Sequence, residues 1–336
     1  MRKFNLFLMG IFILVSATAQ DKHTTFHLSF FPPLSTNGIK AYEYTNGASF
    51  SLLTGISKNE ENFSFAVLSN VITNDAKGFQ FAGLSNFIGN NGKGMLFSGL
   101  ANIMRGSYSG FQFAGLGNIV KNDVTGFQFA GLINIAKNVN GFQFAGLINK
   151  AKNVNGVQFA GLINIAENSD YPIGLINIIK NGEKGIAITY NEAGSVMATF
   201  RSGGRVTYGI IGVGYNHKTS GRSYATEAGF GVHINCLSWF RINNELKAAS
   251  FGASDSPFIV NDDKLSNTVM VANYSILPAF KISPHFELFG GPSLNYMNSE
   301  STNTELNFGH SIWKKTGSTR LQQIYVGYQV GVQYLF

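Results

Sequence analysis

The chain contains very little cysteine, tryptophan, proline or charge. Its single cysteine, Cys236, excludes an intrachain disulfide and any metal site built from clustered cysteines. Charged residues make up only 13% of the 336 residues, about half of the ~25% that is usual in soluble domains. The net charge of +7 comes from lysines and arginines that are scattered singly, so no basic patch for a nucleic acid is indicated.

Glycine and aromatic residues are abundant instead. The sequence has 39 Gly, 30 Phe and 13 Tyr, and 44% of it is hydrophobic. A disordered chain lacks such apolar mass, and a coiled coil avoids glycine. After residue 20 no stretch of 18 apolar residues occurs, so no transmembrane helix is expected. The composition predicts a large all-β protein in apolar surroundings.

The N-terminus has the pattern of a secretory signal. Arg2 and Lys3 precede a ten-residue apolar run, Leu6–Val15, and small residues ending at Ala19 form an A-x-A cleavage pattern. At 1.5 Å per residue the run covers only about half of a ~30 Å hydrocarbon core, which argues against an anchor. We therefore expect residues 1–19 to be a cleaved signal peptide and the mature chain to be exported.

A repeat occupies residues 62–179. The segment Gly78–Asn86, with the sequence GFQFAGLSN, recurs every 15 or 16 residues, and polar turn-forming segments separate the copies. Further copies begin at Gly94, Gly110, Gly126, Gly141 and Gly156, with a diverged copy at Asn62 and a shortened one at Pro172. Each unit is predicted to be one strand of about ten residues followed by a tight connection.

Alternate residues of a repeat differ sharply. In the Gly126 copy, Phe127, Phe129, Ile133 and Ile135 share one face, and Gln128, Ala130, Asn134 and Ala136 share the other. A strand of about ten residues rises about 33 Å and, tilted by ~40°, spans roughly the 25 Å apolar band of an outer-membrane barrel. A barrel predicts lipid-facing Phe79, Phe111, Phe127 and Phe142, and lumen-facing Gln80, Gln112, Gln128 and Gln143.

A β-solenoid is the alternative for the repeat block. Stacked in parallel, the repeats would align one asparagine of each unit, namely Asn86, Asn102, Asn118, Asn134, Asn149 and Asn164. The Phe/Ile face would then be the core and the Gln/Asn face would meet water. Parallel pairing places Gln128 beside Gln143, whereas antiparallel pairing places Gln128 near Asn149.

The second half has no repeat but keeps the alternation. In the last segment, Ile324–Phe336, even positions are apolar and most odd positions are Gly or Gln, a pattern typical of a closing outer-membrane strand. Non-repeat barrel strands are expected over residues 185–336. With the repeats included, the sequence predicts one antiparallel transmembrane β-barrel of roughly 16–18 strands over residues 20–336.

Charges on the alternating strands form the one candidate site. They are Glu227, His233, Arg241, Glu245, Lys247, Lys281 and Glu287. Because Arg or Lys at the lipid midplane costs ~2–4 kcal/mol, we expect these side chains to point into the lumen. They could form a selectivity region or a salt-bridge network that fills the lumen, and we favour the network.

The GFQFAGLIN-type repeats resemble those of uncharacterised surface-repeat-containing outer-membrane proteins of Bacteroidota and spirochaetes. The segments 30–38 (FFPPLSTNG) and 172–182 (PIGLINIIKNG) look like the opening and the closing of such an array. The resemblance covers about residues 28–215. It brings no biochemical activity and no catalytic residues with it.

The sequence contains no pattern that indicates an enzyme, a cofactor or a metal site. We expect a non-enzymatic outer-membrane β-barrel of a Gram-negative bacterium, acting as an envelope structural element or a narrow passive channel. A secreted β-solenoid adhesin or scaffold is the alternative. Expected partners are outer-membrane lipid and the barrel-assembly machinery, with no nucleic acid and with the oligomeric state left open. The assembly signal is expected in the terminal apolar stripe, which comprises Tyr328, Val330, Val332, Tyr334 and Phe336.

Overall fold

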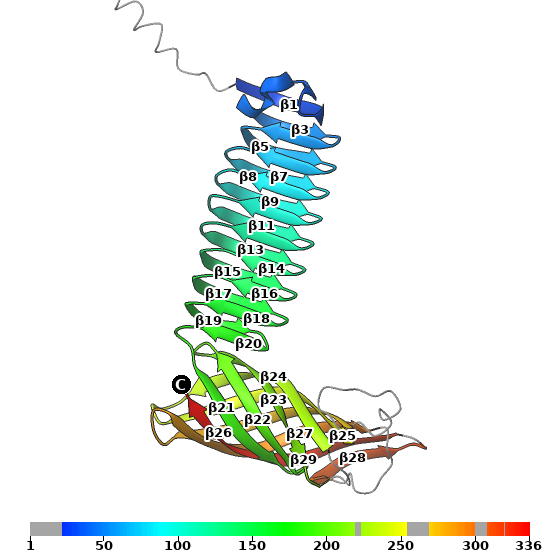
Figure 1. The fold of residues 1–336 in the computed structure, drawn as a ribbon, viewed down its shortest axis with the longest axis vertical. Helices are drawn as coiled ribbons and strands as arrows, with labels where there is room; N and C mark the ends of the chain where they lie inside the picture. The colour runs from blue at the N-terminus through cyan, green and yellow to red at the C-terminus, as the bar shows by residue number, and fades with distance from the viewer. Residues whose placement is uncertain (1–21, 219–222, 254–268, 300–307, 319) are drawn as a thin grey trace, which may run out of the picture. The chain divides into compact units, whose positions relative to one another are not determined.

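In the computed structural model, each repeat forms one coil of a parallel β-solenoid (Figure 1). The structure describes residues 22–218, 223–253, 269–299, 308–318 and 320–336, so the predicted signal peptide lies outside the described residues. The chain divides into two units, Met1–Asn122 and Asp123–Phe336. Within the described ranges, no helix has the length and apolar character needed to cross a bilayer.

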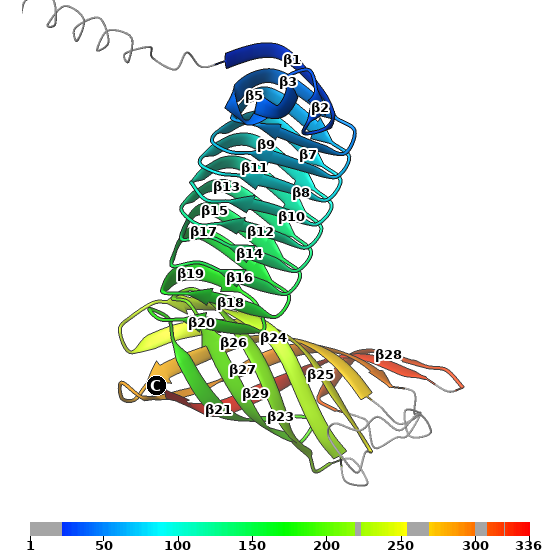
Figure 2. The ribbon, with the colours of Figure 1, turned by 45° about the horizontal axis from the view of Figure 1, so that its top comes forward.

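The first unit consists of coils, and from residue 44 onward each has a long strand, a corner, a short strand and a polar turn (Figure 2). The long strands are β1 (Lys22–Phe31), β3 (Tyr44–Ser51), β5 (Asn59–Ala66), β7 (Ala76–Ala82), β9 (Gly92–Ser98) and β11 (Tyr108–Ala114). The short strands are β4 (Thr54–Ser57), β6 (Ser69–Ile72), β8 (Ser85–Ile88), β10 (Ala101–Met104) and β12 (Gly117–Val120). The corner is Leu52-Leu53 after β3, Val67-Leu68 after β5 and Gly-Leu from β7 onward. The short strand β2 (Leu34–Ser35) and the 3₁₀ helix η1 (Gly38–Glu43) follow β1 and contact each other at the first coil.

The second unit begins with coils of the same kind. Their long strands are β13 (Val124–Ala130), β15 (Asn138–Ala145), β17 (Asn153–Ala160) and β19 (Asn168–Ile173), and their short strands are β14 (Ile133–Ile135), β16 (Ile148–Lys150), β18 (Ile163–Ala166) and β20 (Ile176–Ile179). Gln128 pairs with Gln143 and Asn134 with Asn149, both in parallel. The solenoid alternative for the repeat block is therefore confirmed, and the assignment of residues 62–179 to the barrel wall is wrong.

The coils bury their amides together with small and aliphatic side chains such as Val139 and Ala145, and expose their phenylalanines. Gln128 and Asn134 are completely buried, while Phe142 is 44% exposed. The expectation that a solenoid would bury its Phe/Ile face is wrong, because amides of successive coils hydrogen-bond to one another inside the stack. Gln143 Nε2 donates to Gln128 Oε1 (2.8 Å), and Asn134 Nδ2 donates to Asn149 Oδ1 (3.0 Å). Gln80 Oε1 and Gln158 Oε1 have no partner among the described residues. A buried amide whose hydrogen bonds are all made carries little desolvation cost.

Outward phenylalanines stack from coil to coil. The rings of Phe81 and Phe97 are 4.8 Å apart and nearly parallel, as are those of Phe144 and Phe159. Glycine opens each repeat for a steric reason. Gly141 has a φ of +137°, and a Cβ at this position would overlap the carbonyl oxygen of Gly126.

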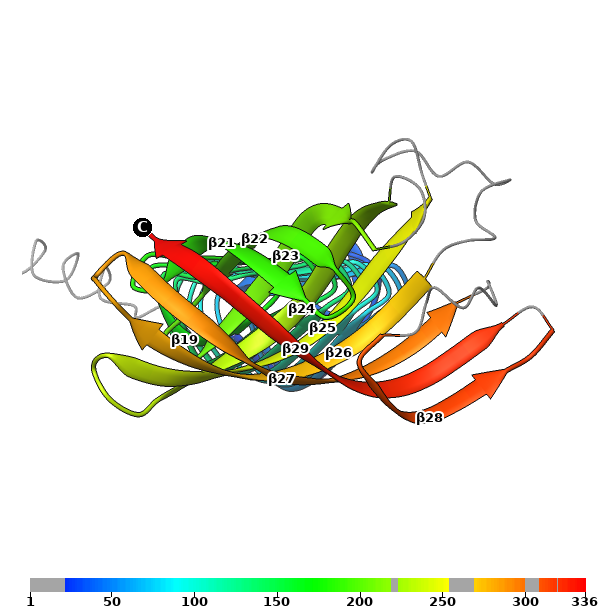
Figure 3. The same cartoon turned by 90° about the horizontal axis from the view of Figure 1, so that it is seen from below.

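Residues 184–335 form a closed antiparallel barrel (Figure 3). Its eight strands are β21 (Lys184–Asn191), β22 (Ser195–Gly203), β23 (Thr207–Asn216), β24 (Ser223–Asn235), β25 (Phe240–Ala253), β26 (Val269–Lys281), β27 (Phe286–Ser299) and β29 (Leu321–Leu335). Pairing of β21 with β29 closes the ring, and β28 (His310–Thr316) pairs only with β29.

The antiparallel barrel is thus confirmed, but the predicted number of 16–18 strands is wrong. The predicted number includes the repeats as barrel strands, whereas the repeats pair in parallel with one another and form a separate stack. The prediction of one barrel over residues 20–336 is wrong for the same reason. The barrel begins at Lys184, one residue before the predicted start of the non-repeat strands.

Candidate functional site

The seven predicted lumen residues lie on four neighbouring strands. Strand β24 carries Glu227 and His233, β25 carries Arg241, Glu245 and Lys247, β26 carries Lys281, and β27 carries Glu287. The structure places all seven inside the barrel or at its mouth. Lys281 is the most exposed, and Glu245 and Glu287 are completely buried. Their positions follow from the two-residue period of the strands, which puts alternate side chains on one face.

The first group surrounds Arg241. Arg241 Nη1 lies 2.6 Å from Glu183 Oε2, and Arg241 Nε lies 2.8 Å from Glu287 Oε2. The second contact is an ion pair without a hydrogen bond, because the Nε–H does not point toward the oxygen. Lys281 Nζ lies 3.3 Å from Glu183 Oε1. Asn243 connects His233 to this group, since its Oδ1 is 2.7 Å from His233 Nδ1 and its Nδ2 donates to Glu287 Oε1.

The second group surrounds Glu245. Arg201 Nη2 lies 2.9 Å from Glu245 Oε1, and Tyr208 donates its hydroxyl proton to the same oxygen at 2.9 Å. Lys247 Nζ is 3.5 Å from Glu245 Oε2 and 3.3 Å from Glu227 Oε2. The guanidinium of Arg201 also lies 4.2 Å from the ring centre of Phe289, a cation–π arrangement.

Sequence reasoning missed three members of these groups: Glu183, Arg201 and Tyr208. Arg201 shares the inward face of β22 with Met197 and Thr199, so the alternation contained a signal for it. Glu183 lies in the turn before β21, where no strand alternation applies. Only the tertiary structure brings its carboxylate to Arg241.

A small cavity and an apolar cluster lie beside these two groups. A cavity of about 30 Å³ lies beside Glu227, Lys247 and Gln329, room for about two water molecules. Glu227 Oε1 and Gln329 Nε2 have no hydrogen-bond partner among the described residues, which suits water binding at this place. An apolar cluster toward the β21–β22 turn includes Met197, Met297, Phe308 and Tyr325.

The chemistry of the lumen is charge pairing. Four cations, Arg201, Arg241, Lys247 and Lys281, face four carboxylates, Glu183, Glu227, Glu245 and Glu287. Across the ranges that the structure describes, no group of three or more His, Cys, Asp or Glu side chains is arranged to hold a metal ion. Each of the four cations lies within 4 Å of at least one of the carboxylates, so the arrangement is suited to holding the strands together.

A second buried acid lies in the first unit. Glu60 on β5 is 3% exposed, and its partners are neutral: Ser49 Oγ lies 2.7 and 2.9 Å from its two oxygens, and Asn46 Nδ2 donates to Oε1 at 3.0 Å. Burial raises the pKa of Glu60 to about 7, and the hydrogen bonds from Asn46, Ser49 and Ser57 oppose this rise only in part.

Glu60 should make the stability of the first coils depend on pH. Its folded-state pKa of about 7 exceeds the ordinary value of 4.5, so the folded chain holds the extra proton between these values. Stability is then present at low pH and is lost, by up to about 3 kcal/mol, as the pH rises through this window. We expect hydrogen exchange of residues 44–66, corrected for intrinsic rates, to report easier opening at pH 8 than at pH 5.

Glu60→Gln should remove this pH dependence. Glu61→Gln is the matched control, because Glu61 is exposed and pairs with His23 at 3.1 Å on the surface. If the pH dependence of hydrogen exchange is the same in Glu60→Gln as in the wild type, another group is responsible for it.

Comparisons with known proteins concern the barrel. No protein-family model matches the chain, and no curated protein matches it. The N-terminal β-barrel domain of Pseudomonas aeruginosa OprF is similar with 12% identity, a TM-score of 0.29 and coverage of 46% of this chain and 96% of that chain. The Yersinia pestis outer membrane protein Ail, solved in a phospholipid bilayer nanodisc, is similar with 14% identity, a TM-score of 0.28 and coverage of 46% and 99%. Because both scores and both identities are low, the barrel assignment rests on the strand pairing of this chain.

Proposed function

We propose that the chain is a non-enzymatic outer-membrane protein whose closed barrel anchors a β-solenoid in the envelope as a structural element. The observation that carries this proposal is the distribution of polarity across the barrel wall. Apart from Lys184 at the start of β21, every charged side chain of the eight strands points into the lumen or its mouth. The outside of the wall is therefore free of the charges that a lipid-facing surface cannot carry.

The outer face is apolar on every strand. An exposed aliphatic residue occurs on each, namely Ile188, Val196, Val213, Val232, Leu246, Ile276, Leu294 and Val330. Contiguous apolar surface on this scale is unfavourable in water and favourable against acyl chains. All three connections at the end near the C-terminus are short (204–206, 236–239 and 282–285). At the other end one turn is short (192–194), whereas in the sequence 15 residues (254–268) separate the end of β25 from the start of β26. Outer-membrane barrels show this asymmetry, with the short turns in the periplasm.

The terminal strand supports membrane assembly. Tyr328, Val330, Val332, Tyr334 and Phe336 are all exposed on the outer side of the barrel. Aromatic side chains at the end of such a stripe suit the interface between headgroups and acyl chains. We infer that this stripe is the segment that the barrel-assembly machinery reads, after export directed by residues 1–19.

The paired charges of the lumen favour a structural element over a passive channel. The chain should stay in the membrane pellet after carbonate extraction, and in a planar bilayer the purified protein should give no stable conductance steps. The reason is that buried ion pairs and an apolar cluster lie across the described lumen, and the cavity beside Glu227 and Lys247 has a volume of about 30 Å³, whereas conduction needs a continuous water path.

A general porin in the same bilayer is the positive control for these recordings. Large, stable steps from this protein would replace the structural role with a channel. Complete extraction by carbonate would instead favour the alternative of a secreted solenoid adhesin or scaffold. The parallel coils are the observation that supports this alternative.

A further inference from the structure

The outer surface of the coils is divided sharply into an apolar part and a charged part. In the coil that starts at Gly141, Phe142, Phe144 and Leu147 are between 39% and 45% exposed. Lys152 and Asn140 lie at the polar turn at the opposite edge of the coil. Exposed large apolar side chains on this scale mark a surface that something covers.

All charges of the coils lie at or near the turn edge. Residues 62–180 contain eight Lys or Arg and four Asp or Glu, and each lies in a polar turn or within three residues of a strand end beside it. Neither the middle of the long strands nor the Gly-Leu corners carries a charge. The charged edge is thus net positive, which suits anionic headgroups.

The apolar part is no deeper than one lipid leaflet. From Phe127 to Leu132 the chain spans at most about 16 Å, because β13 ends at Ala130 and the corner follows. Half of a hydrocarbon core of ~30 Å is about 15 Å. A coil with its charged edge among the headgroups would place its leucine corner near the middle of the bilayer.

Contacts within the second unit show at which height along the barrel strands the last coil lies. Strand β19 lies against β23, and β20 lies against β22. The Val206 N–H donates to Asp170 O (3.2 Å), and Thr207 Oγ1 donates to Pro172 O (2.8 Å). Gly209 lies against the Gly174-Leu175 corner. The polar edge of the coil is therefore level with a short barrel turn, and its leucine corner is farther along β23, beside the barrel wall.

We propose that the outward Phe, Ile and Leu side chains of the coils are embedded in the phospholipid leaflet at the short-turn end of the barrel, with the Lys-rich edge among the anionic headgroups. This inference rests on the proposed function, because it takes the barrel wall to be in lipid. Lipid can cover the long-strand face, the corner and the short-strand face of a coil at once, and exposed apolar residues occur on all three, for example Phe144, Leu147 and Ile178.

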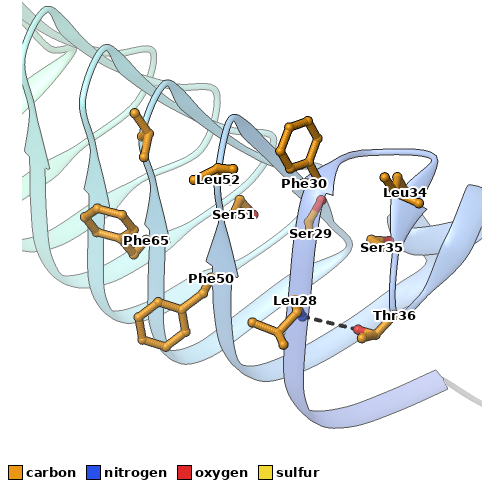
Figure 4. A pocket seen from close by; sticks show the side chains of 11 residues that line it. Leu28, Ser29, Phe30, Leu34, Ser35, Thr36, Phe50, Ser51, Leu52 and Phe65 are labelled. Carbon is orange, nitrogen blue, oxygen red and sulfur yellow. Dashed lines mark hydrogen bonds between the residues drawn. The ribbon is translucent and has the colours of Figure 1, made fainter.

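The first unit also has an exposed apolar surface that lipid can cover. An open groove of about 640 Å³ runs along the outer side of its first coils, lined by Leu28, Phe30, Leu34, Phe50 and Phe65 among others (Figure 4). The Leu28 N–H donates to Thr36 Oγ1 at 3.2 Å and holds the segment after β2 along one side. An acyl chain is the ligand that such a surface fits.

The test uses the full chain in vesicles of phosphatidylethanolamine and phosphatidylglycerol. With Cys236→Ser as background, an environment-sensitive fluorophore is attached to Leu147→Cys on the coil. Quenching by bromine on the acyl chains should exceed quenching by aqueous iodide by about threefold or more, as for other membrane-inserted apolar faces. Asn140→Cys at the turn edge should show the reverse ratio, and Leu132→Cys on the neighbouring coil repeats the measurement if Leu147→Cys does not fold.

A fluorophore at Leu246→Cys, on the outer face of β25, separates the two proposals. If iodide quenches it while bromine does not, the barrel is not in lipid and the proposed function fails. If bromine quenches position 246 but iodide quenches position 147, only the coil inference is overturned. Protection of position 147 from both quenchers, together with disulfide-linked dimers of Leu147→Cys, would identify a second copy as the occupant and also overturn it.

Discussion

Arg241→Ala is expected to lower the free energy of unfolding of the barrel by about 3–5 kcal/mol. The substitution removes the cation that lies 2.6 Å from Glu183 and 2.8 Å from Glu287. Glu287 is completely buried, so its carboxylate would remain in the lumen with Asn243 Nδ2 as a neutral partner. An uncompensated buried charge costs several kcal/mol. The measurement is the temperature and urea dependence of heat-modifiable gel migration in detergent.

Two further variants test whether charge pairing causes the loss. Arg205→Ala is the matched control, because the Arg205 side chain is 70% exposed and 3.9 Å from Asp170, a pair worth less than about 1 kcal/mol. Arg241→Met combined with Glu287→Gln should recover part of the stability, since it leaves no charge at position 287. Equal losses in Arg241→Ala and Arg205→Ala would contradict a packed network.

Asn149→Asp is expected to open the coils around it at a cost of about 3 kcal/mol or more. Asn149 Nδ2 donates to Asn164 Oδ1 (3.0 Å) and to Phe159 O (2.7 Å), and its Oδ1 accepts from Asn134. Aspartate has the same shape but turns two donated hydrogen bonds into contacts between acceptors. Hydrogen exchange of residues 138–166 at neutral pH should report the lost protection.

The control for this variant is Asn140→Asp, on the long strand β15 of the same coil. Asn140 is exposed and only accepts from Asn155 Nδ2 at 3.2 Å, a bond that a carboxylate keeps. At acidic pH the protonated carboxyl group of the Asn149→Asp variant can donate again, so protection should return in part. Similar exchange in Asn149→Asp and Asn140→Asp at neutral pH would contradict the ladder as a source of stability.

The repeat pattern predicted which side chains share a face but not what lies on each side. Phe127 and Gln128 point to opposite faces in any strand, because successive side chains alternate. This alternation is the same in an antiparallel barrel and in a parallel coil. The prediction that Gln128 faces a barrel lumen was wrong, and so was the expectation that it would meet water in a solenoid, because it is buried inside a coil.

The lumen charges were predictable for a related reason. Arg241 and Glu245 alternate with apolar neighbours on one strand, and the cost of a charge in lipid places them inside. The pairing itself was not predictable, because Glu183 lies outside the strands and the partner of each inward charge depends on the register of strands that are far apart in sequence.

The sequence by itself determined the all-β character, which phenylalanines, amides and charges share a face of a strand, and the place where the repeats end. These features depend on local chain geometry and on the free energy of placing single side chains in water or lipid. Only the tertiary structure decided the parallel stacking of the repeats, the eight-strand closure and the pairing of Arg241 with Glu183. Strand pairing is chosen by hydrogen bonds between distant segments, and a two-residue period permits either direction.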